Sequence, residues 1–356
     1  MYIIPVLLII AVAIAFHYGP FGKKQSTDKT ADITPEANIP PKAELPEVKQ
    51  TTTERITKKK PEPEPLLESL SGQPPEPVRE PNFTKVSVKP KLPEIIPVPD
   101  VEPNPEAAKL IAEATALLGE KPGRIIEARS RLKEALRIPM SVQQRTFVKD
   151  QMSELADKWL FSREIFDDKL CGSLEVKPGD QLRTIGKRFK VPYEILMDIN
   201  KISQPQNLRA GEAIKVINGP FHAKVYRSTF TMDLYLQDTF VRSFHVGLGK
   251  PGSETPTGLW RVKTGGKLIK PVWKNPLDGK TYYPEDPDYP LGSRWIGLEG
   301  LKGSAKDRTG FAIHGTKDPE QIGTADSQGC IRLHNGDAIL IYNLFEEDLS
   351  TVEVVE

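Results

Sequence analysis

The chain has 356 residues, enough for two or three domains. Its 49 basic and 48 acidic side chains nearly cancel, so it lacks the excess of positive charge that nucleic-acid backbones require, and we expect no nucleic-acid partner. Two cysteines, Cys171 and Cys330, are too few for a disulfide framework and lack the C-x-x-C spacing of a structural zinc site. With no G-x-x-x-x-G-K or H-E-x-x-H motif either, we expect no nucleotide, metal or other cofactor.

Residues 2–18, YIIPVLLIIAVAIAFHY, carry no charged side chain. A helix of this length just crosses the ~30 Å hydrocarbon core, so the segment is a membrane anchor or a secretory signal. We favour an uncleaved anchor, because the small residues suited to cleavage lie inside the apolar run. Lys23 and Lys24 follow the span, so the positive-inside rule alone points the wrong way, and the orientation is argued from the downstream domains.

The next segment is rich in proline, glutamate, lysine and threonine. Of the 33 prolines, 17 lie between Lys23 and Pro105. Such a composition cannot bury enough apolar surface to offset the entropy of ordering, and proline favours an extended backbone. We therefore expect a disordered, semi-rigid stalk that spaces the later domains from the membrane.

Between Glu106 and Phe166, apolar residues recur at spacings of three and four and predict three amphipathic helices. Gly119 with Pro122–Gly123 separates the first two helices, and Ile138–Pro139 ends the second. The pattern AxxLIxEAxxLL followed by ARSRLKEAL is similar to a tetratricopeptide-like hairpin. We interpret this segment as a structural spacer or a partner-docking unit.

Residues 174–217 predict the order β-α-α-β, with a turn at Pro178–Gly179 and a helix capped near Asp180. The segment resembles a LysM domain in V-K-P-G-D, L-x-x-I-x-x-R-F-x-V, L-x-x-I-N and L-R-x-G-E-x-I-K-V, although Gln181 replaces the usual threonine. The resemblance implies binding of N-acetylglucosamine-containing glycans, with Gly179, Asp180 and Gln181 as candidate contacts. The alternative is a scaffold that no longer binds sugar.

From Pro220 onward, short alternating patterns with Gly and Asp turns predict a β-rich domain. Within it, FAIHGT forms a strand ending on His314, and SQGCIR brings Cys330 further along the chain. A thiol is a strong nucleophile only as a thiolate, so Cys330 needs a base, and His314 is the candidate. The amides of Gly329 and Cys330 are candidate oxyanion donors, and Arg332 is a candidate carboxylate ligand. Together these residues indicate acyl transfer through a thioester.

The stretch IHGT, a short spacer and SQGCIRL resembles the L,D-transpeptidase (YkuD-like) catalytic domain. VGLGKPGSETPTGLWRV and PLGSRWIGL match further motifs of that family. The resemblance implies a mostly-β fold with Cys330 as nucleophile, His314 as proton donor and acceptor, and the Gly315 carbonyl orienting the imidazole. Ser327 and Gln328 join Arg332 as candidate substrate contacts, and Gln328 stands where many members have histidine. From the residues alone, we expect Ser327, Asn335 and Asp337 to shape the turn and to cap a following helix at 338–345.

The same resemblance implies peptidoglycan stem peptides as substrates, and roles in peptidoglycan biosynthesis, cell-wall organisation and cell shape. Cys330 would attack the bond between a diamino acid and a terminal D-alanine, release D-alanine and pass the acyl group to an amine. An amine on another stem gives a 3→3 crosslink, a protein amine gives protein attachment, and water gives L,D-carboxypeptidase activity. The remaining alternative is a non-catalytic LysM wall-binding protein in which Gln328 marks a decayed site.

Other arrangements of the reactive side chains are less favoured. A zinc site formed by His314, Cys330 and His334 lacks an obvious fourth ligand. Cys171 has no visible base, so we expect a passive thiol that is not bonded to Cys330. Because LysM-like and transpeptidase-like domains meet their substrates only outside the cytoplasmic membrane, we expect an anchored protein whose catalytic domain faces the periplasm or cell-wall space.

The fold class is therefore multidomain, with a mostly-β catalytic domain, a small β-α-α-β domain, a short helical segment, an anchor and a proline-rich stalk. The predicted boundaries are 2–18 for the anchor or signal, 19–105 for the linker, 106–170 for the helical segment, 172–218 for the LysM-like domain and 219–356 for the catalytic domain.

Overall fold

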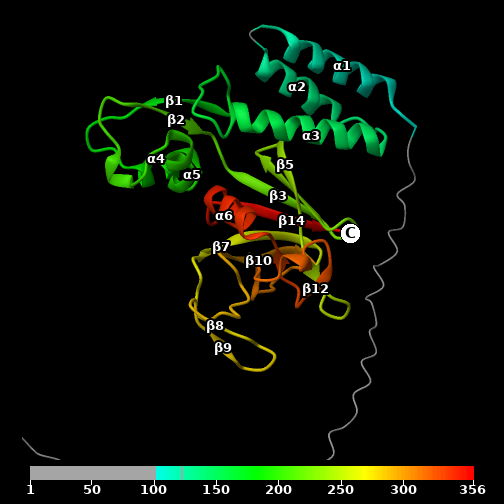
Figure 1. Cartoon of the computed structure of the whole chain (residues 1–356), viewed down its shortest axis with the longest axis vertical. Coiled ribbons are helices and arrows are strands. Elements are labelled where there is room, and N and C mark those ends of the chain that lie inside the picture. The colour runs from blue at the N-terminus through cyan, green and yellow to red at the C-terminus, as the bar shows by residue number, and fades with distance from the viewer. Residues whose placement is uncertain (1–101, 122) are drawn as a thin grey trace, which may run out of the picture. The chain divides into compact units, whose positions relative to one another are not determined.

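The computed structural model describes residues 102–121 and 123–356 (Figure 1). The anchor or signal predicted at 2–18 and nearly all of the linker predicted at 19–105 lie outside the described residues, so both stay predictions. Within the described ranges, no helix combines the length and the apolar character needed to cross a membrane.

The described part begins with the three predicted helices: α1 (Pro105–Gly119), α2 (Ile125–Ala135) and α3 (Val142–Trp159). The Asn104 side chain accepts hydrogen bonds from the first amides of α1, and Ser141 and Gln144 form a capping box on α3. The Gln144 side chain also donates to the Asn104 carbonyl at 2.9 Å, which ties the two helix starts together. Local capping therefore explains where these helices begin.

The next elements have the predicted β-α-α-β order: β1 (Cys171–Glu175), α4 (Leu182–Phe189), α5 (Tyr193–Asn200), the 3₁₀ turn η1 (Pro205–Asn207) and β2 (Ala213–Ile217). Strands β1 and β2 pair antiparallel. Helix α4 begins next to the predicted Asp180: Gln181 occupies the cap position without a side-chain bond, and the Asp180 carboxylate accepts from the Lys177 amide at 2.8 Å.

Asn200 has a structural role in this module. It is buried, its side chain donates to the carbonyls of Leu196 and Lys215, and it accepts from the Lys215 amide at 2.7 Å. These bonds join the end of α5 to β2.

The remaining elements form a β-rich domain. They are β3 (Phe221–Tyr226), β4 (Thr231–Leu236), β5 (Thr239–His245), β6 (Leu248–Gly249), β7 (Gly258–Leu268), β8 (Trp273–Lys274), β9 (Thr281–Tyr282), β10 (Trp295–Gly303), β11 (Phe311–His314), η2 (Pro319–Gln321), β12 (Ala325–Ser327), β13 (Ile331–Arg332), α6 (Asn335–Leu344) and β14 (Thr351–Val355). The main sheet has the order β13-β11-β10-β7-β14-β3-β4-β5, while β6 pairs with β12 and β8 with β9. Side chains of β3 alternate between buried and half-buried, as expected of a strand with one face on the core.

Helix α6 begins earlier than the sequence suggested. The prediction placed it at 338–345 with a side-chain cap, whereas it begins at Asn335 and His334 occupies the cap position without a side-chain bond. The Asn335 side chain instead accepts from the Ser293 amide and donates to the Thr316 carbonyl, both at 2.8 Å. Asn335 therefore holds two loops beside the end of β11.

The helical segment is bonded to the modules that follow it. Lys149 on α3 reaches the fully buried Asp233 of β4, with 2.6 Å between Nζ and Oδ2. Lys215 on β2 is 1% exposed and donates to the carbonyls of Trp159, Ser162 and Glu164, near the end of α3. Helix α3 also packs against β5 (Figure 1).

Candidate active site

Two adjacent strands place the candidate nucleophile and base on one face of the sheet. Strands β11 and β13 pair in parallel, with Ile313 opposite Ile331 and His314 opposite Arg332. Because successive side chains of a strand point to opposite faces, Cys330, immediately before β13, shares its face with His314 and Arg332. Cys330 and His314 are therefore diagonal neighbours on adjacent strands.

The turn before Cys330 requires glycine. Gly329 has φ +107°, a conformation that other residues rarely adopt, and an added Cβ would lie 2.7 Å from Cε1 of Phe311. The Gly329 carbonyl accepts a hydrogen bond from the buried Thr255 hydroxyl at 2.9 Å. Thr255 also accepts from the Gly249 amide at 3.1 Å, so it ties this turn to β6.

Ser327 closes the same turn from within. Its hydroxyl donates to the Cys330 carbonyl at 2.6 Å and accepts from the Gly329 amide at 3.0 Å. The Gly329 amide is therefore already bonded, which contradicts its expected availability as an oxyanion donor. Ser327 is 1% exposed and shapes the turn, and its role as a substrate contact stays a prediction. Gln328, between them, is exposed.

His314 is held in one orientation at the end of β11. Its Nδ1 lies 2.6 Å from the Gly315 carbonyl oxygen, so Nδ1 carries the proton and Nε2 carries the lone pair. The ring stacks on Trp295, with 5.6 Å between ring centroids and 19° between planes. Burial lowers the pKa of His314 to about 4, against the opposing effect of hydrogen bonds to the backbone of Gly315 and Leu291.

The Cys330 side chain is half-buried, and its Sγ lies 4.0 Å from the Gly310 carbonyl oxygen. Burial raises the pKa of this thiol, opposed by the Ala312 backbone and by the charge of Arg332. At neutral pH the resting pair is therefore a neutral thiol and a neutral imidazole. The neutral His314 ring can accept the thiol proton, but in this state it supplies no positive charge that would stabilise a thiolate.

Arg332 makes its contacts within the protein. Its Nη1 donates to Gln321 Oε1 at 2.7 Å and lies 3.8 Å from Asp326 Oδ2. Its backbone pairs with Gly247, since each amide donates to the other's carbonyl. A substrate carboxylate would have to compete with Gln321 for the guanidinium.

Sequence reasoning missed several residues that shape this site. Thr255 lies within the T-P-x-G motif and Trp295 within PLGSRWIGL, so both were inside recognised motifs without an assigned role. Gln321 carried no local signal, and Asn335 was expected only at the turn and the helix cap, because their contacts reach residues distant in the sequence.

The zinc alternative gains no support from the geometry. Among the residues that the structure describes, no group of three or more His, Cys, Asp and Glu side chains is arranged to hold a metal ion. Both cysteines are free thiols, and Cys171 is buried, which raises its pKa to about 12. Cys171 is therefore a poor nucleophile.

The candidate glycan contacts lie on one exposed loop. Gly179, Asp180 and Gln181 connect β1 to α4, and Gly179 has φ +89°. Gln181 makes no capping bond through its side chain, whereas Asp180 stabilises the loop itself. The loop is exposed and therefore accessible to a ligand.

A sheet that sets a cysteine beside a buried histidine defines a candidate cysteine acyltransferase. The family model of the L,D-transpeptidase catalytic domain matches residues 220–354, and that of the LysM domain matches residues 174–216. YkuD of Bacillus subtilis, which is named as an L,D-transpeptidase, is 30% identical over 172 residues, covering 46% of this chain and 88% of that protein. Its counterpart in Bacillus licheniformis is 28% identical, with the same coverage of both chains.

The NMR structure of the catalytic domain from the E. faecium L,D-transpeptidase is 22% identical, with a TM-score of 0.29, and the likeness covers 38% of this chain and 95% of that one. The family assignment rests on the sequence matches. The chain belongs to the L,D-transpeptidase family and carries a LysM domain before a YkuD-type catalytic domain. Both predicted resemblances are confirmed.

Proposed function

We propose that this protein is a peptidoglycan L,D-transpeptidase that forms a thioester between Cys330 and a stem peptide. The observation that carries the proposal is the parallel register of β11 and β13, which places Cys330 and His314 on one face. The hydrogen bond from His314 to the Gly315 carbonyl supports it, because it leaves Nε2 as the basic atom.

In the proposed reaction, His314 Nε2 takes the thiol proton as Cys330 Sγ attacks the carbonyl carbon of the L,D peptide bond. The Gly329 amide already donates to the Ser327 hydroxyl. We therefore assign the hydrogen bond that stabilises the oxyanion to the Cys330 amide. The imidazolium then protonates the departing amine of D-alanine, and a thioester remains. An acceptor amine gives its proton to His314, attacks the thioester and releases the thiol.

We further propose that the LysM domain holds the enzyme on wall glycan, and that residues 2–18 anchor it with the catalytic domain outside the cytoplasmic membrane. The support is chemical, since glycan strands and stem peptides occur together only there. Protease treatment of intact spheroplasts should cleave within residues 19–105. Full protection of that segment would overturn the topology.

The catalytic proposal is tested by intact-protein mass spectrometry of the full chain after incubation with a carbapenem, which mimics the acyl donor. We expect one covalent adduct on the wild type and on Cys171→Ala, none on Cys330→Ala, and strongly slowed formation on His314→Ala. No adduct on wild-type protein that still binds glycan would favour the non-catalytic alternative. Incubation with stem tetrapeptides, with and without an amine acceptor, then separates crosslinking from hydrolysis.

A further inference from the structure

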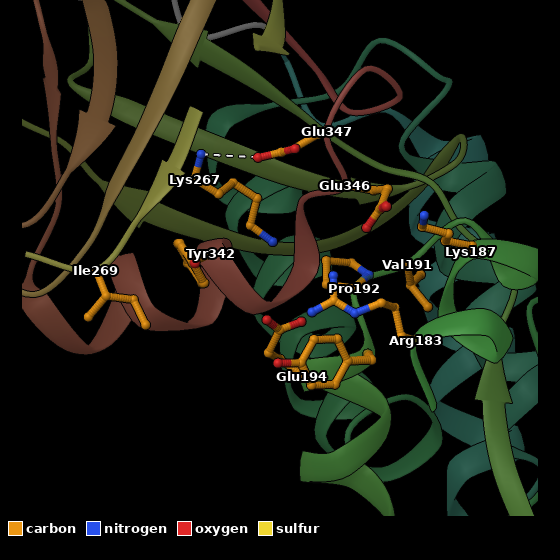
Figure 2. A pocket seen from close by; sticks show the side chains of 11 residues that line it. Arg183, Lys187, Val191, Pro192, Glu194, Lys267, Ile269, Tyr342, Glu346 and Glu347 are labelled. Carbon is orange, nitrogen blue, oxygen red and sulfur yellow. Dashed lines mark hydrogen bonds between the residues drawn. The ribbon is translucent and has the colours of Figure 1, made fainter. Parts of the chain in front are cut away.

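A cleft of about 450 Å³ lies between the LysM module and the catalytic domain, separate from the cysteine site (Figure 2). One wall comes from α4 and the start of α5, and the other from β7 and the end of α6. Six of the lining residues are charged or aromatic side chains from both walls: Arg183, Tyr193, Glu194, Lys267, Tyr342 and Glu346.

The cleft lies apart from the chemistry. It adjoins the C-terminal end of α6, whereas Arg332 and Cys330 precede the N-terminal end of the same helix. The ten residues of α6 span about 15 Å, so one small chemical group cannot occupy the cleft and the cysteine site at the same time.

The cleft is lined by charges of both signs that do not pair with one another. Figure 2 shows Lys267 and Glu346 reaching in from the catalytic domain, and Arg183 and Glu194 from the LysM module. Among the described residues, no ion pair within 4 Å joins any of these four side chains. These charges act on one another at longer range, since Glu194 and Glu346 both favour the charged form of Lys267, and each can gain a closer opposite charge from a ligand.

Both cations also lie over aromatic rings. Lys267 Nζ is 4.5 Å from the centre of the Tyr342 ring, and the guanidinium carbon of Arg183 is 5.4 Å from that of Tyr193. Such contacts limit the positions of the charged groups. Partial burial lowers the pKa of Lys267 and raises that of Glu346, so both groups have lost water that a ligand could replace.

The two walls are held together at one side of the cleft. Asn343 on α6 donates to the Asp198 carboxylate on α5 at 2.9 Å. On the catalytic side, the Glu347 carboxylate accepts from the Gly265 amide at 3.0 Å and from the Lys267 amide at 3.2 Å, and these bonds fix the end of β7. Figure 2 shows the bond to Lys267.

From this arrangement we infer that the cleft is a second peptidoglycan-binding site, which takes the zwitterionic peptide part of a stem through its ammonium and carboxylate groups. The substrate class rests on the proposed function. A carboxylate of the stem lies against Lys267 and Arg183, and its free amine against Glu346 and Glu194. The cleft thus holds peptide between the module that holds glycan and the domain that performs the chemistry.

The test is isothermal titration calorimetry on full-length protein carrying Cys330→Ala, with two probes: a stem tetrapeptide containing a diamino acid and the uncharged tetramer of N-acetylglucosamine. Lys267→Met and Glu346→Gln each remove one charge from the cleft. Lys263→Met is the matched control, because Lys263 lies exposed on the same strand. Arg183→Gln repeats the test at an exposed position, where folding is insensitive to the change.

We expect each cleft variant to weaken tetrapeptide binding about tenfold, the typical effect of losing one charge-assisted contact. Tetramer binding and the Lys263→Met control should stay at the parent values. Unchanged tetrapeptide binding in all three cleft variants, or an equal loss for both probes, would overturn the inference. Carbapenem acylation in a Cys330 background reports on the proposed function separately, and the Lys263→Met control should leave its rate unchanged.

Discussion

The hydroxyl group of Thr255 connects the turn before Cys330 to strand β6. Thr255 donates to the Gly329 carbonyl and accepts from the Gly249 amide, and it is 2% exposed. A group that makes two bonds in a buried position fixes the backbone on both sides. The placement of Cys330 therefore depends on a residue 75 positions earlier in the chain.

Thr255→Val keeps the shape of this side chain and removes both hydrogen bonds. We expect a loss of about 1–3 kcal/mol in the free energy of unfolding and about a tenfold slower acylation of Cys330, because the turn becomes less defined. Thr255→Ser, which keeps the hydroxyl, should lie close to wild type. Thermal unfolding and carbapenem acylation rates measure the two effects, and a Val variant as fast as the Ser variant would contradict this role.

The buried imidazole of His314 sets the lowest pH at which Cys330 can be acylated. Because its pKa is lowered to about 4, the ring stays neutral and basic down to that pH. Protonation below this value removes the base, so acylation should be lost as the pH falls through about 4, well below the ordinary histidine value near 6.5. Acylation rates between pH 3.5 and 7.5, with circular dichroism as a folding control, provide the measurement. Half-loss near pH 6.5 would contradict the described burial.

Among the elements, α3 has an unusual C-terminal partner. The Lys215 ammonium donates to three carbonyls at and beyond the end of this helix and is itself almost fully buried. Carbonyls at helix ends lack partners within the helix, and a cation there also favours the helix dipole. Burial lowers the pKa of Lys215. One strand of the LysM module therefore completes a helix of the preceding segment.

Lys215→Met fills the same volume without the ammonium, so the three carbonyls lose their donor. We expect the free energy of unfolding to fall by about 2–3 kcal/mol, measured by urea denaturation of the full chain. Lys177→Met, at an exposed position of the same module, should change it by less than about 0.5 kcal/mol. Equal effects of the two substitutions would show that the contact is dispensable.

Local sequence signals predicted most of the helices and strands. The three helices and the β-α-α-β order followed from periodicity and capping, which are local, and Cys330 and His314 came from motif and spacing. The occupied Gly329 amide, the pairing of Arg332 with Gln321 and the start of α6 did not follow. Each depends on competition between hydrogen-bond partners that only the folded chain brings together.

For the molecule as a whole, the helical segment is more than a spacer. Asp233, in the catalytic sheet, has no exposed surface, and its carboxylate pairs with Lys149 while Ser243 donates to it at 2.6 Å. Arg242 on β5 also pairs with Asp157 on α3. A buried carboxylate depends strongly on its cation. The helical segment is thus part of the stability of the catalytic domain.

Lys149→Met would leave the Asp233 carboxylate buried without its cation. We expect a loss of about 3–5 kcal/mol in the free energy of unfolding, partly recovered when Asp233→Asn is added. Lys158→Met, exposed on the same helix, serves as the control. Urea unfolding of the wild type, Lys149→Met, Asp233→Asn and the double variant gives the coupling between the two residues. Additive losses in the double variant would show that the pair does not act as a unit.

Strand β14 joins two halves of the main sheet. It pairs antiparallel with β7 on one side and parallel with β3 on the other, although it follows every other described strand in the sequence. During synthesis, β3-β4-β5 and β7-β10-β11-β13 therefore emerge as two separate groups whose facing edges stay unpaired until residues 351–355 arrive. The Cys330 thiol and the His314 imidazole lie in the second group, so the sheet that positions them is complete only when β14 has paired with both β7 and β3.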